Sequence, residues 1–463
     1  MSTDSILTAI RIEWTKIKHE IETLFVQQWD DPELSAMEYR SSERLANWLM
    51  SHGFSVEKKA HGIPTAFIAR AGIPGGPVVG ILLEYDALPG LDNVSEAYRE
   101  SLGKSAGHGC GHNHIGPANA GAAIATLRAL KILNLKGEIY VVGCPAEEIL
   151  WGKIALYKAG AFAGIDIILT SHGDYQTGSI SRPCQSVVSS EFVFSGQAGH
   201  GGNKLQFNAL LTAEMAVREA YEQCREKFPN ILVRHVTRKG GIMPTITPSE
   251  ARVWFTTRGF NFLETQNALN VIENIARQVA KETDTSVNFQ FITETRGYLP
   301  NDVLGKFLYE TLSVVGPPDW SQSDIEFMQT LAKYCLPNEP MTLDRNIGYF
   351  TEGEDYYGQD DGEISWRIPL GRINWAYPTQ IPIHHWAWTA LSGNKASYPG
   401  PLMASEALAI AAVNIMLNSR IVDDAKDELA NRTVGLVLTE PRLGASHALV
   451  EDPASFWEAR WTN

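Results

Sequence analysis

A glycine-rich stretch of ten residues, Gly107 to Gly116, holds the densest group of possible metal ligands in the chain. It contains one thiol, that of Cys110, and three imidazoles, those of His108, His112 and His114. Glycine adopts positive-φ turns that residues with side chains avoid, so the backbone can fold back and direct Cys110 and His112 at one point. A thiolate and a neutral imidazole make up half of a tetrahedral metal shell.

Three more ligands are predicted outside this stretch. Glu148 and His172 each follow a short apolar run, and a further imidazole comes from His384 or His385. A single cysteine or histidine is more often a buried structural residue than a ligand. Five such features together favour a metal site, in which sulfur, nitrogen and oxygen atoms hold one or two divalent ions, Mn²⁺ or Zn²⁺.

Glu147 stands beside Glu148 and is predicted to act as a general base. One carboxylate of such a pair would bind metal, while the other takes a proton from a water molecule that the ion activates. Adjacent glutamates usually lie on a solvated helix face. Here a strand and the dipeptide Pro145-Ala146 precede them, which favours a loop at the end of a strand.

The elements that must position these side chains alternate between strands and helices. Apolar runs predict buried strands, and apolar residues at helical spacing predict helices. This order is typical of a mostly parallel α/β sheet, in which ligands lie at the carboxyl ends of the strands. The strands are predicted at 77–83, 138–143 and 165–169, and the helices at 6–28, 41–51, 118–133 and 153–159.

A second pattern follows, in the order strand, helix, two strands, helix and strand, which is the ferredoxin-like α+β plan. We therefore expect a catalytic α/β domain at 1–186 and 298–463, interrupted by an inserted ferredoxin-like domain at 187–297. The last part is predicted to hold a loop-rich aromatic segment at 352–388 and a closing helix at 402–417. The elements of the insert are predicted at 187–194, 209–227, 231–236, 251–257, 265–283 and 286–293.

The composition argues against some classes of protein. Asp and Glu outnumber Lys and Arg by 53 to 39, and the net charge of -14 argues against a nucleic-acid-binding protein. Five widely spaced cysteines indicate a reducing compartment and no disulfide framework. We expect no signal peptide, and no membrane span because Arg128 interrupts the apolar run at 118–130. The protein is expected to be cytoplasmic.

Five motifs, in the same order along nearly the whole chain, resemble the metal-dependent aminoacylase and carboxypeptidase family. The most similar branch is that of p-aminobenzoyl-glutamate hydrolase and related amidohydrolases, in which a cysteine is a metal ligand. The resemblance implies a dinuclear-metal α/β domain and an inserted ferredoxin-like domain that forms a homodimer. The motifs lie at 84–88, 107–113, 145–148, 362–366 and 382–386.

The resemblance also implies roles for single residues. His384 is preferred to His385 because the family's histidine directly follows a proline and an aliphatic residue. Asp86 is expected to orient a ligand from outside the metal shell, and His108 is a candidate for the same kind of role. The implied metal ligands are Cys110, His112, Glu148, His172 and His384, and the implied base is Glu147.

Substrate contacts are implied for four residues. His200 matches a histidine that reaches across a dimer to stabilise the oxyanion, and Arg258 matches an arginine that holds a substrate carboxylate. A surface charge at a strand edge is the alternative for Arg258. Thr245 stands where close relatives have an asparagine, and Trp151 lies where they have a small glycine-rich turn. A bulkier and more aromatic pocket would favour an aromatic substrate.

The predicted function is metal-dependent hydrolysis of a C–N bond, with the amide of an N-acyl or N-aroyl amino acid as the expected substrate. Two alternatives remain. The same metal centre could act as a hydrolytic deaminase that releases ammonia from an aromatic amine, which the altered pocket wall motivates. The other alternative is a non-catalytic dimeric binding protein, although such a protein would be expected to have lost a ligand or Glu147.

Overall fold

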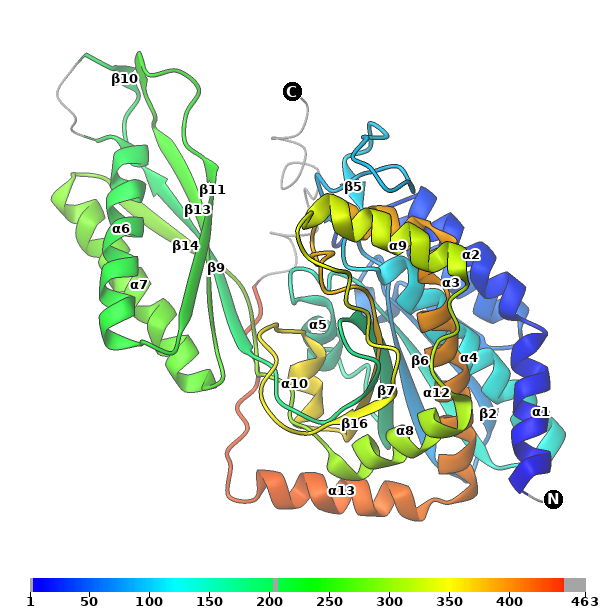
Figure 1. Ribbon diagram of the computed structural model, residues 1–463. Helices are drawn as coiled ribbons and strands as arrows, with labels where there is room; N and C mark the ends of the chain where they lie inside the picture. The colour runs from blue at the N-terminus through cyan, green and yellow to red at the C-terminus, as the bar shows by residue number, and fades with distance from the viewer. Residues whose placement is uncertain (1–2, 203–206, 445–463) are drawn as a thin grey trace.

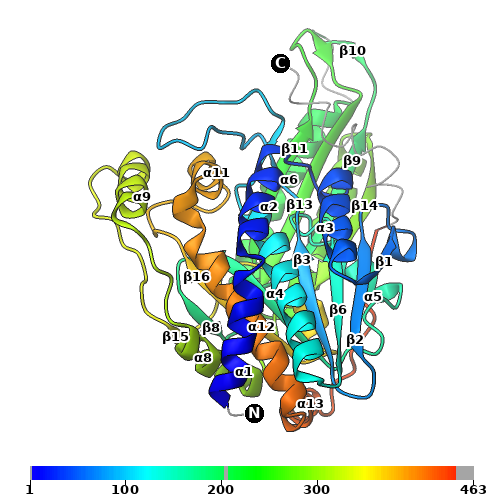
Figure 2. The ribbon, with the colours of Figure 1, turned by 90° about the vertical axis from the view of Figure 1, so that its right-hand side faces the viewer.

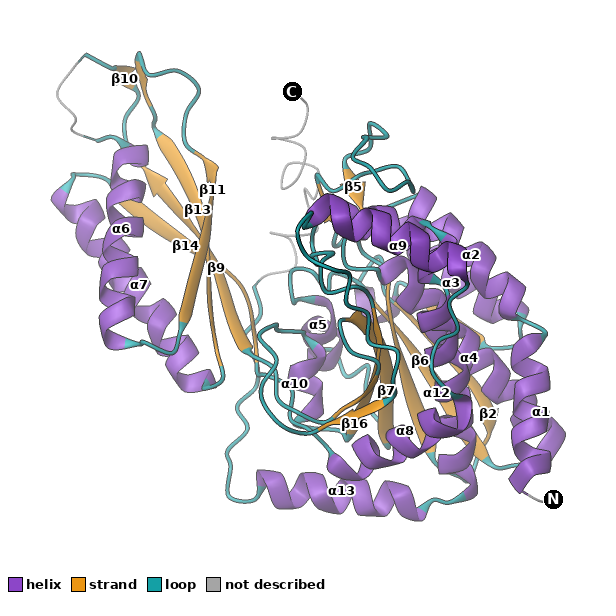
Figure 3. Ribbon diagram, viewed as in Figure 1, coloured by secondary structure: helices purple, strands orange, loops and turns teal. Residues whose placement is uncertain are grey.

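The protein consists of a main α/β domain and a smaller insert that stands beside it (Figure 1). This computed structural model describes residues 3–202 and 207–444. The insert comprises residues 186–295, and the chain before and after it forms the main domain. Figure 3 shows helices on both sides of the sheet in the main domain, whereas in the insert two helices lie together on one face of a sheet.

An eight-stranded sheet runs through the main domain. In spatial order its strands are β1 (Ser55–Lys58), β2 (Phe67–Ile73), β6 (Gly137–Cys144), β3 (Val78–Glu84), β7 (Ile167–Asp174), β16 (Leu370–Ala376), β8 (Gly178–Ile180) and β15 (Gly348–Phe350). The central strands β6, β3, β7 and β16 are parallel, and antiparallel pairs occur toward both edges. The predicted mostly parallel α/β class is confirmed.

Helices cover both faces of this sheet, as Figure 2 shows for one of them. Successive strand residues point to opposite faces, so Ile81 and Leu83 belong to the larger core and Leu82 to the smaller one. The smaller core includes α5 (Gly152–Lys158) and α10 (Asp361–Ser365). The larger core takes side chains from α1 (Thr3–Thr15), α2 (Lys18–Asp30), α3 (Tyr39–Ser51), α4 (His112–Leu133), α8 (Asp302–Val315), α9 (Gln322–Cys335), α11 (Trp386–Gly393), α12 (Pro399–Leu417) and α13 (Arg420–Thr433).

Two predictions about the main domain are wrong. The helix predicted at 6–28 is two helices, because the chain turns between α1 and α2, where the N–H of Ile17 donates to the carbonyl of Trp14 (3.0 Å). Both side chains are buried, so the turn keeps both in the core. The segment at 352–388 is not mainly loop, since it contains the central strand β16 and the helix α10.

The insert has the predicted ferredoxin-like architecture. Its antiparallel sheet runs in the order β11 (Leu232–Lys239), β13 (Glu250–Gly259), β9 (Ser186–Ser195) and β14 (Ser286–Thr295). The helices α6 (Ala209–Lys227) and α7 (Phe262–Glu282) begin after Asn208 and Asn261, whose side chains accept a hydrogen bond from the first turn. A short pair, β10 (Gly199–His200) and β12 (Ile246–Thr247), lies at the end of the insert remote from the main domain (Figure 1).

Residues 439–444, which we call the C-terminal strap, run along the junction between the two domains. On the side of the insert, Arg442 forms an ion pair with Glu294 at 2.7 Å. On the side of the main domain, the ammonium of Lys158 donates to the carbonyl of Pro441 at 3.0 Å. The strap therefore contacts both domains.

One helix among the described residues, Lys395–Leu417, is long and apolar enough to cross a membrane. It contains α12, and 83% of its most apolar window is buried inside the protein. Burial of this kind is typical of a core helix, and α12 packs against α4 and α8.

Candidate functional site

The glycine-rich stretch places Cys110 in front of the first turn of α4. Gly111, which precedes the helix, has a φ of +83°, a conformation that side-chain-bearing residues rarely adopt. His112 is therefore the first residue of the helix, directly after the turn. The carbonyl of Gly109 accepts a hydrogen bond from the N–H of His384 (2.9 Å), which joins this stretch to the C-terminal part of the main domain.

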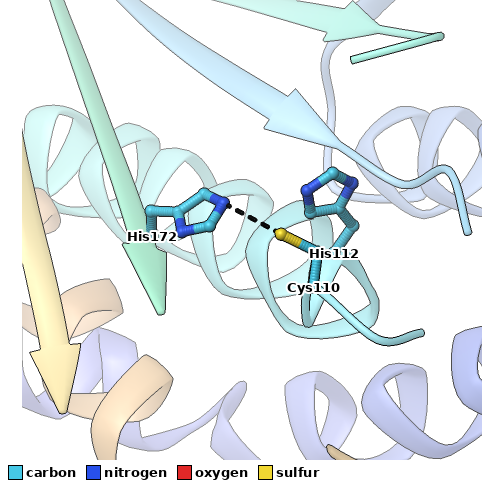
Figure 4. Close-up of side chains that lie close together, drawn as sticks. All are labelled: Cys110, His112 and His172. Carbon is cyan, nitrogen blue, oxygen red and sulfur yellow. Dashed lines mark hydrogen bonds between the residues drawn. The ribbon is translucent and has the colours of Figure 1, made fainter. Parts of the chain in front are cut away.

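Cys110, His112 and His172 form a first group of possible ligands (Figure 4). Their ligand atoms lie within 4.8 Å of one another, and the Sγ of Cys110 is 3.7 Å from the Nε2 of His172. The Nδ1–H of His172 donates to the carbonyl of Gly173 (2.6 Å), which leaves its Nε2 directed at the thiol. Burial lowers the pKa of His172 to about 4, so the ring is neutral, which is the form that binds metal.

Cys110, Glu148 and His384 form a second group, again with ligand atoms within 4.8 Å of one another. The Nε2 of His384 lies 3.3 Å from a carboxylate oxygen of Glu148. His385 has another task, because its Nδ1 accepts a hydrogen bond from the N–H of Ala387 (3.3 Å) at the start of α11. The geometry thus favours His384 as the ligand, and the thiol of Cys110 is shared by both groups.

Asp86, just beyond β3, orients two of these residues. Its side chain is 1% exposed and accepts three hydrogen bonds. One oxygen accepts from the Nδ1–H of His112 (2.9 Å). The other accepts from the hydroxyl of Ser35 (2.7 Å) and from the backbone N–H of Glu148 (3.0 Å). Because Asp86 occupies Nδ1, the Nε2 of His112 remains for a metal ion.

A tight turn after β6 carries the paired glutamates. Ala146 and Leu150 both have a φ of +56°, and a Cβ at Gly152 would lie 1.6 Å from a backbone carbonyl oxygen. The turn brings Glu147 into the site with 4% exposure. Burial, followed by the nearby charge of Glu84, raises the pKa of Glu147 well above its usual range.

The side chains of this centre fit a divalent cation. Three buried atoms have no hydrogen-bond partner among the described residues: Nε2 of His112, Oε1 of Glu148 and Oε2 of Glu84. Buried polar atoms without partners are rare, and an ion is one of the few explanations for several at one place. The ligand atoms are sulfur, nitrogen and oxygen, a set that suits zinc and admits manganese.

A cavity of about 1180 Å³ opens onto these ligands. Arg258, on strand β13 of the insert, lines the same cavity as Glu147 and Glu148, so both domains contribute to it. The cavity exceeds the usual range of about 300–1,000 Å³ for small-molecule sites. Its aromatic side chains, which we call the aromatic wall, are Tyr175, Phe350, Tyr356 and Tyr357.

Three predicted site residues lie away from the cavity. His200 is exposed on β10 and Thr245 is exposed just before β12, both at the remote end of the insert. His108 is buried, and its ring contacts the carbonyl of Gln28 (3.1 Å), so its role is structural. Within one chain, none of the three meets the possible ligands.

The substrate contact predicted for Trp151 is not supported by its position. Its side chain is 2% exposed and packs in a small cluster with Ile292 of the insert and Leu443 of the C-terminal strap. The neighbouring Leu150 lines the cavity instead. A bulky residue follows the paired glutamates because it fills the junction between the domains.

The sequence interpretation missed three buried charged residues beside the centre: Glu84, Lys153 and Asp360. The ammonium of Lys153 lies 2.7 Å from a carboxylate oxygen of Glu84 and 2.5 Å from one of Asp360. Glu84 is the last residue of β3, so the argument from strand ends applies to it as well. No pattern in the sequence marks Lys153, which occupies a helix with apolar neighbours.

The sequence matches no protein-family model. It is 28% identical over 459 residues to a p-aminobenzoyl-glutamate hydrolase polypeptide of Escherichia coli strain K12, and the match covers 92% of this chain and 93% of that protein. This chain resembles the metal-dependent aminoacylases and carboxypeptidases along nearly its whole length. It is also 25% identical over 423 residues to the Xaa-Arg dipeptidase of Mus musculus, with 86% of each chain covered.

Solved structures of this family type share the fold. A dinuclear metal-binding peptidase of the M20 family from Bacillus subtilis superposes with a TM-score of 0.55 at 18% identity, covering 87% of this chain and 99% of that one. An aminobenzoyl-glutamate utilization protein from Klebsiella pneumoniae gives a TM-score of 0.58 at 14% identity, covering 88% and 98%. The expected fold is thereby confirmed.

Proposed function

We propose that the protein is a divalent-metal hydrolase that cleaves the amide bond of an N-acyl or N-aroyl amino acid. The observation that carries the proposal is the convergence of separate chain segments on one end of the cavity, with Glu147 beside them. Relatives named p-aminobenzoyl-glutamate hydrolase and N-acetylcysteine deacetylase support an N-acyl amino acid. The five proposed ligands are Cys110, His112, Glu148, His172 and His384.

The residues of the cavity divide the reaction between them. Ions held by the five ligands would polarise the scissile carbonyl and lower the pKa of water. Glu147 takes a proton from the attacking water and returns it to the departing nitrogen. The pKa of Glu147, raised by burial and by the charge of Glu84, suits a carboxyl that must act as both base and acid near neutral pH. Arg258 holds the substrate carboxylate through a bidentate pair.

The proposal includes a homodimer. His200 and Thr245 are exposed at the remote end of the insert, where a second copy could receive them. His200 of that copy would donate a hydrogen bond to the oxyanion. We also propose Mn²⁺ or Zn²⁺ as the ion and a cytoplasmic location, which the five cysteines support because the structure leaves all of them free.

The test compares the wild-type protein with Glu147→Gln, both loaded with Mn²⁺ or Zn²⁺, on a panel of N-acetyl and N-benzoyl amino acids. Release of the free amino acid is measured. We expect turnover by the wild type and a loss of at least about 100-fold in the variant, as for removal of a general base. Near-normal turnover by Glu147→Gln would contradict the mechanism.

The hydrolytic deaminase is the second candidate, and the aromatic wall favours it because a planar aryl amine could stack there. Assay of ammonia on a panel of aryl amines separates the two reactions. Ammonia without free amino acid would replace the amide hydrolase with the deaminase. Absence of both products and of bound metal would leave a binding protein.

A further inference from the structure

Lys153, on α5, is a fully buried ammonium with more acidic partners than it needs. Its side chain is 0% exposed. Asp360 alone already satisfies it twice, because one carboxylate oxygen accepts from the ammonium (2.5 Å) and the other from the backbone N–H of Lys153 (2.8 Å). An isolated buried ion pair would be complete at this point. Glu84 is nevertheless a second carboxylate partner, at 2.7 Å.

The two oxygens of Glu84 have different surroundings. Oε1 accepts from Lys153, which fixes the orientation of the carboxylate. Oε2 is buried, has no hydrogen-bond partner among the described residues, and lies 3.7 Å from the Nε2 of His112, which also has none. This separation is too long for a hydrogen bond. Two ligands of one ion, each bound at about 2.0–2.2 Å, lie within about 4 Å of each other.

The same point is close to a third carboxylate. The ligand atoms of Glu84, His112 and Glu147 lie within 4.8 Å of one another. Lys153 can balance one of its two carboxylate partners, which leaves one negative charge beside Glu147 without a counterion. Burying such a charge is costly unless a cation is close. The acidic side chains around the centre, each no more than 6% exposed, are Glu84, Asp86, Glu147, Glu148 and Asp360.

We propose that Glu84 contributes a further carboxylate oxygen to the metal centre beside His112, and that Lys153 is the residue that positions it. Asp360 anchors the ammonium from the other side, so that Lys153 directs Oε2 of Glu84 into the centre. The inference rests on the metal centre proposed above. It concerns how tightly that centre holds its ions, which can be measured without any substrate.

The test measures metal binding by the full-length protein. Metal-free wild type, Glu84→Gln and the double variant Glu84→Gln/Lys153→Met are titrated with Zn²⁺ and with Mn²⁺ against a fluorescent chelator, and bound metal is counted by elemental analysis. We expect both variants to bind at least one ion about 10–100-fold more weakly than the wild type, the range found when residues that support a metal site are changed.

The variants are chosen so that folding does not decide the result. Glu84→Gln leaves Lys153 paired with Asp360, so the buried charge stays balanced. The double variant leaves Asp360 as the carboxylate to be accommodated. The matched control is Glu191→Gln, which removes a 2% exposed carboxylate from its arginine partners in the insert. We expect the control to lose stability in thermal unfolding and to keep its metal affinity.

Three outcomes would overturn the inference. The first is metal affinity within about threefold of wild type in Glu84→Gln, measured on the logarithmic scale in which tenfold is 1.4 kcal/mol. The second is an equal loss of affinity in Glu191→Gln. The third is failure of both Glu84 variants to fold, because the inference requires that Asp360 alone can balance Lys153. If instead the wild type binds no metal, the proposed function fails.

Discussion

Asp86→Asn is a sharp test of how the metal centre is organised, because the change alters no bulk. The carboxylate of Asp86 accepts from His112 Nδ1–H on one oxygen and from Ser35 and the Glu148 N–H on the other. An asparagine has one oxygen and one NH₂ group. If its NH₂ faces the N–H of Glu148, two donors oppose each other. If it faces His112, Nδ1 must accept, and the proton moves to Nε2, where the metal should bind.

The expected loss follows from this geometry. Removing a partner that orients a metal-bound histidine costs about 10–100-fold in affinity, which is about 1.4–2.7 kcal/mol. We expect Asp86→Asn to show this loss when the metal-free protein is titrated with Zn²⁺ against a chelator. Thermal unfolding of the metal-free protein reports the loss of hydrogen bonds to a charged group separately, at about 1.5–3 kcal/mol each.

Ser35→Ala is the matched control for this variant. It removes one donor from Asp86 and leaves the contact with His112 in place. We therefore expect a change in metal affinity of less than about threefold, below about 0.7 kcal/mol on the same scale. If Asp86→Asn binds Zn²⁺ as tightly as the wild type, the argument that Asp86 selects the protonated nitrogen of His112 is refuted.

Three further predictions address the ligands and the substrate. His384→Ala should lose metal in elemental analysis, whereas His385→Ala should keep it and lose about 0.5–2 kcal/mol of stability in denaturant unfolding, as expected for a lost helix cap; the reverse result would reassign the ligand. Arg258→Ala should raise KM by about tenfold or more for substrates with a free carboxylate and leave KM unchanged for their carboxamide analogues, because only the former make the charge-assisted pair. Removal of metal with a chelator should abolish turnover and lower the melting temperature, and added Mn²⁺ or Zn²⁺ should restore both; an unaltered melting temperature would argue against a bound ion.

Much of the fold follows from periodicity. The strands β3, β6 and β7 are continuous apolar runs because both faces of the central sheet are buried. The sequence predicts helix α6 with its observed bounds, since its apolar spacing begins directly after the capping residue Asn208. The ferredoxin-like insert follows from the order of such elements.

Strand β16 could not be predicted in this way. It carries Arg372 and Asn374, whose polarity hides a central strand in a search for apolar runs. Inside the protein the guanidinium of Arg372 donates to Asp361 (3.0 Å) and the amide of Asn374 to Asp174 (2.9 Å), so neither is left without a partner. Both pairings join residues of different elements and have no signature in local spacing.

The site shows the same division. Cys110 and His112 are close in the sequence, and Glu148 is at a strand end, so residue type and local position point to them. Trp151 adjoins the paired glutamates, which suggests a substrate contact, yet its side chain points into the domain junction. Lys153 escapes sequence reasoning because its partners come from other elements. Direction of a side chain and long-range pairing are properties of the folded chain.

The C-terminal strap makes the end of the described chain part of the mechanical linkage between the domains. If the insert rotates to bring Arg258 nearer to Glu147, Arg442 must follow Glu294 while Pro441 stays with Lys158. One of these two contacts must then lengthen within two neighbouring residues. Each is worth on the order of 1 kcal/mol, so the strap acts as a tether that sets how far the insert can travel at little energetic cost.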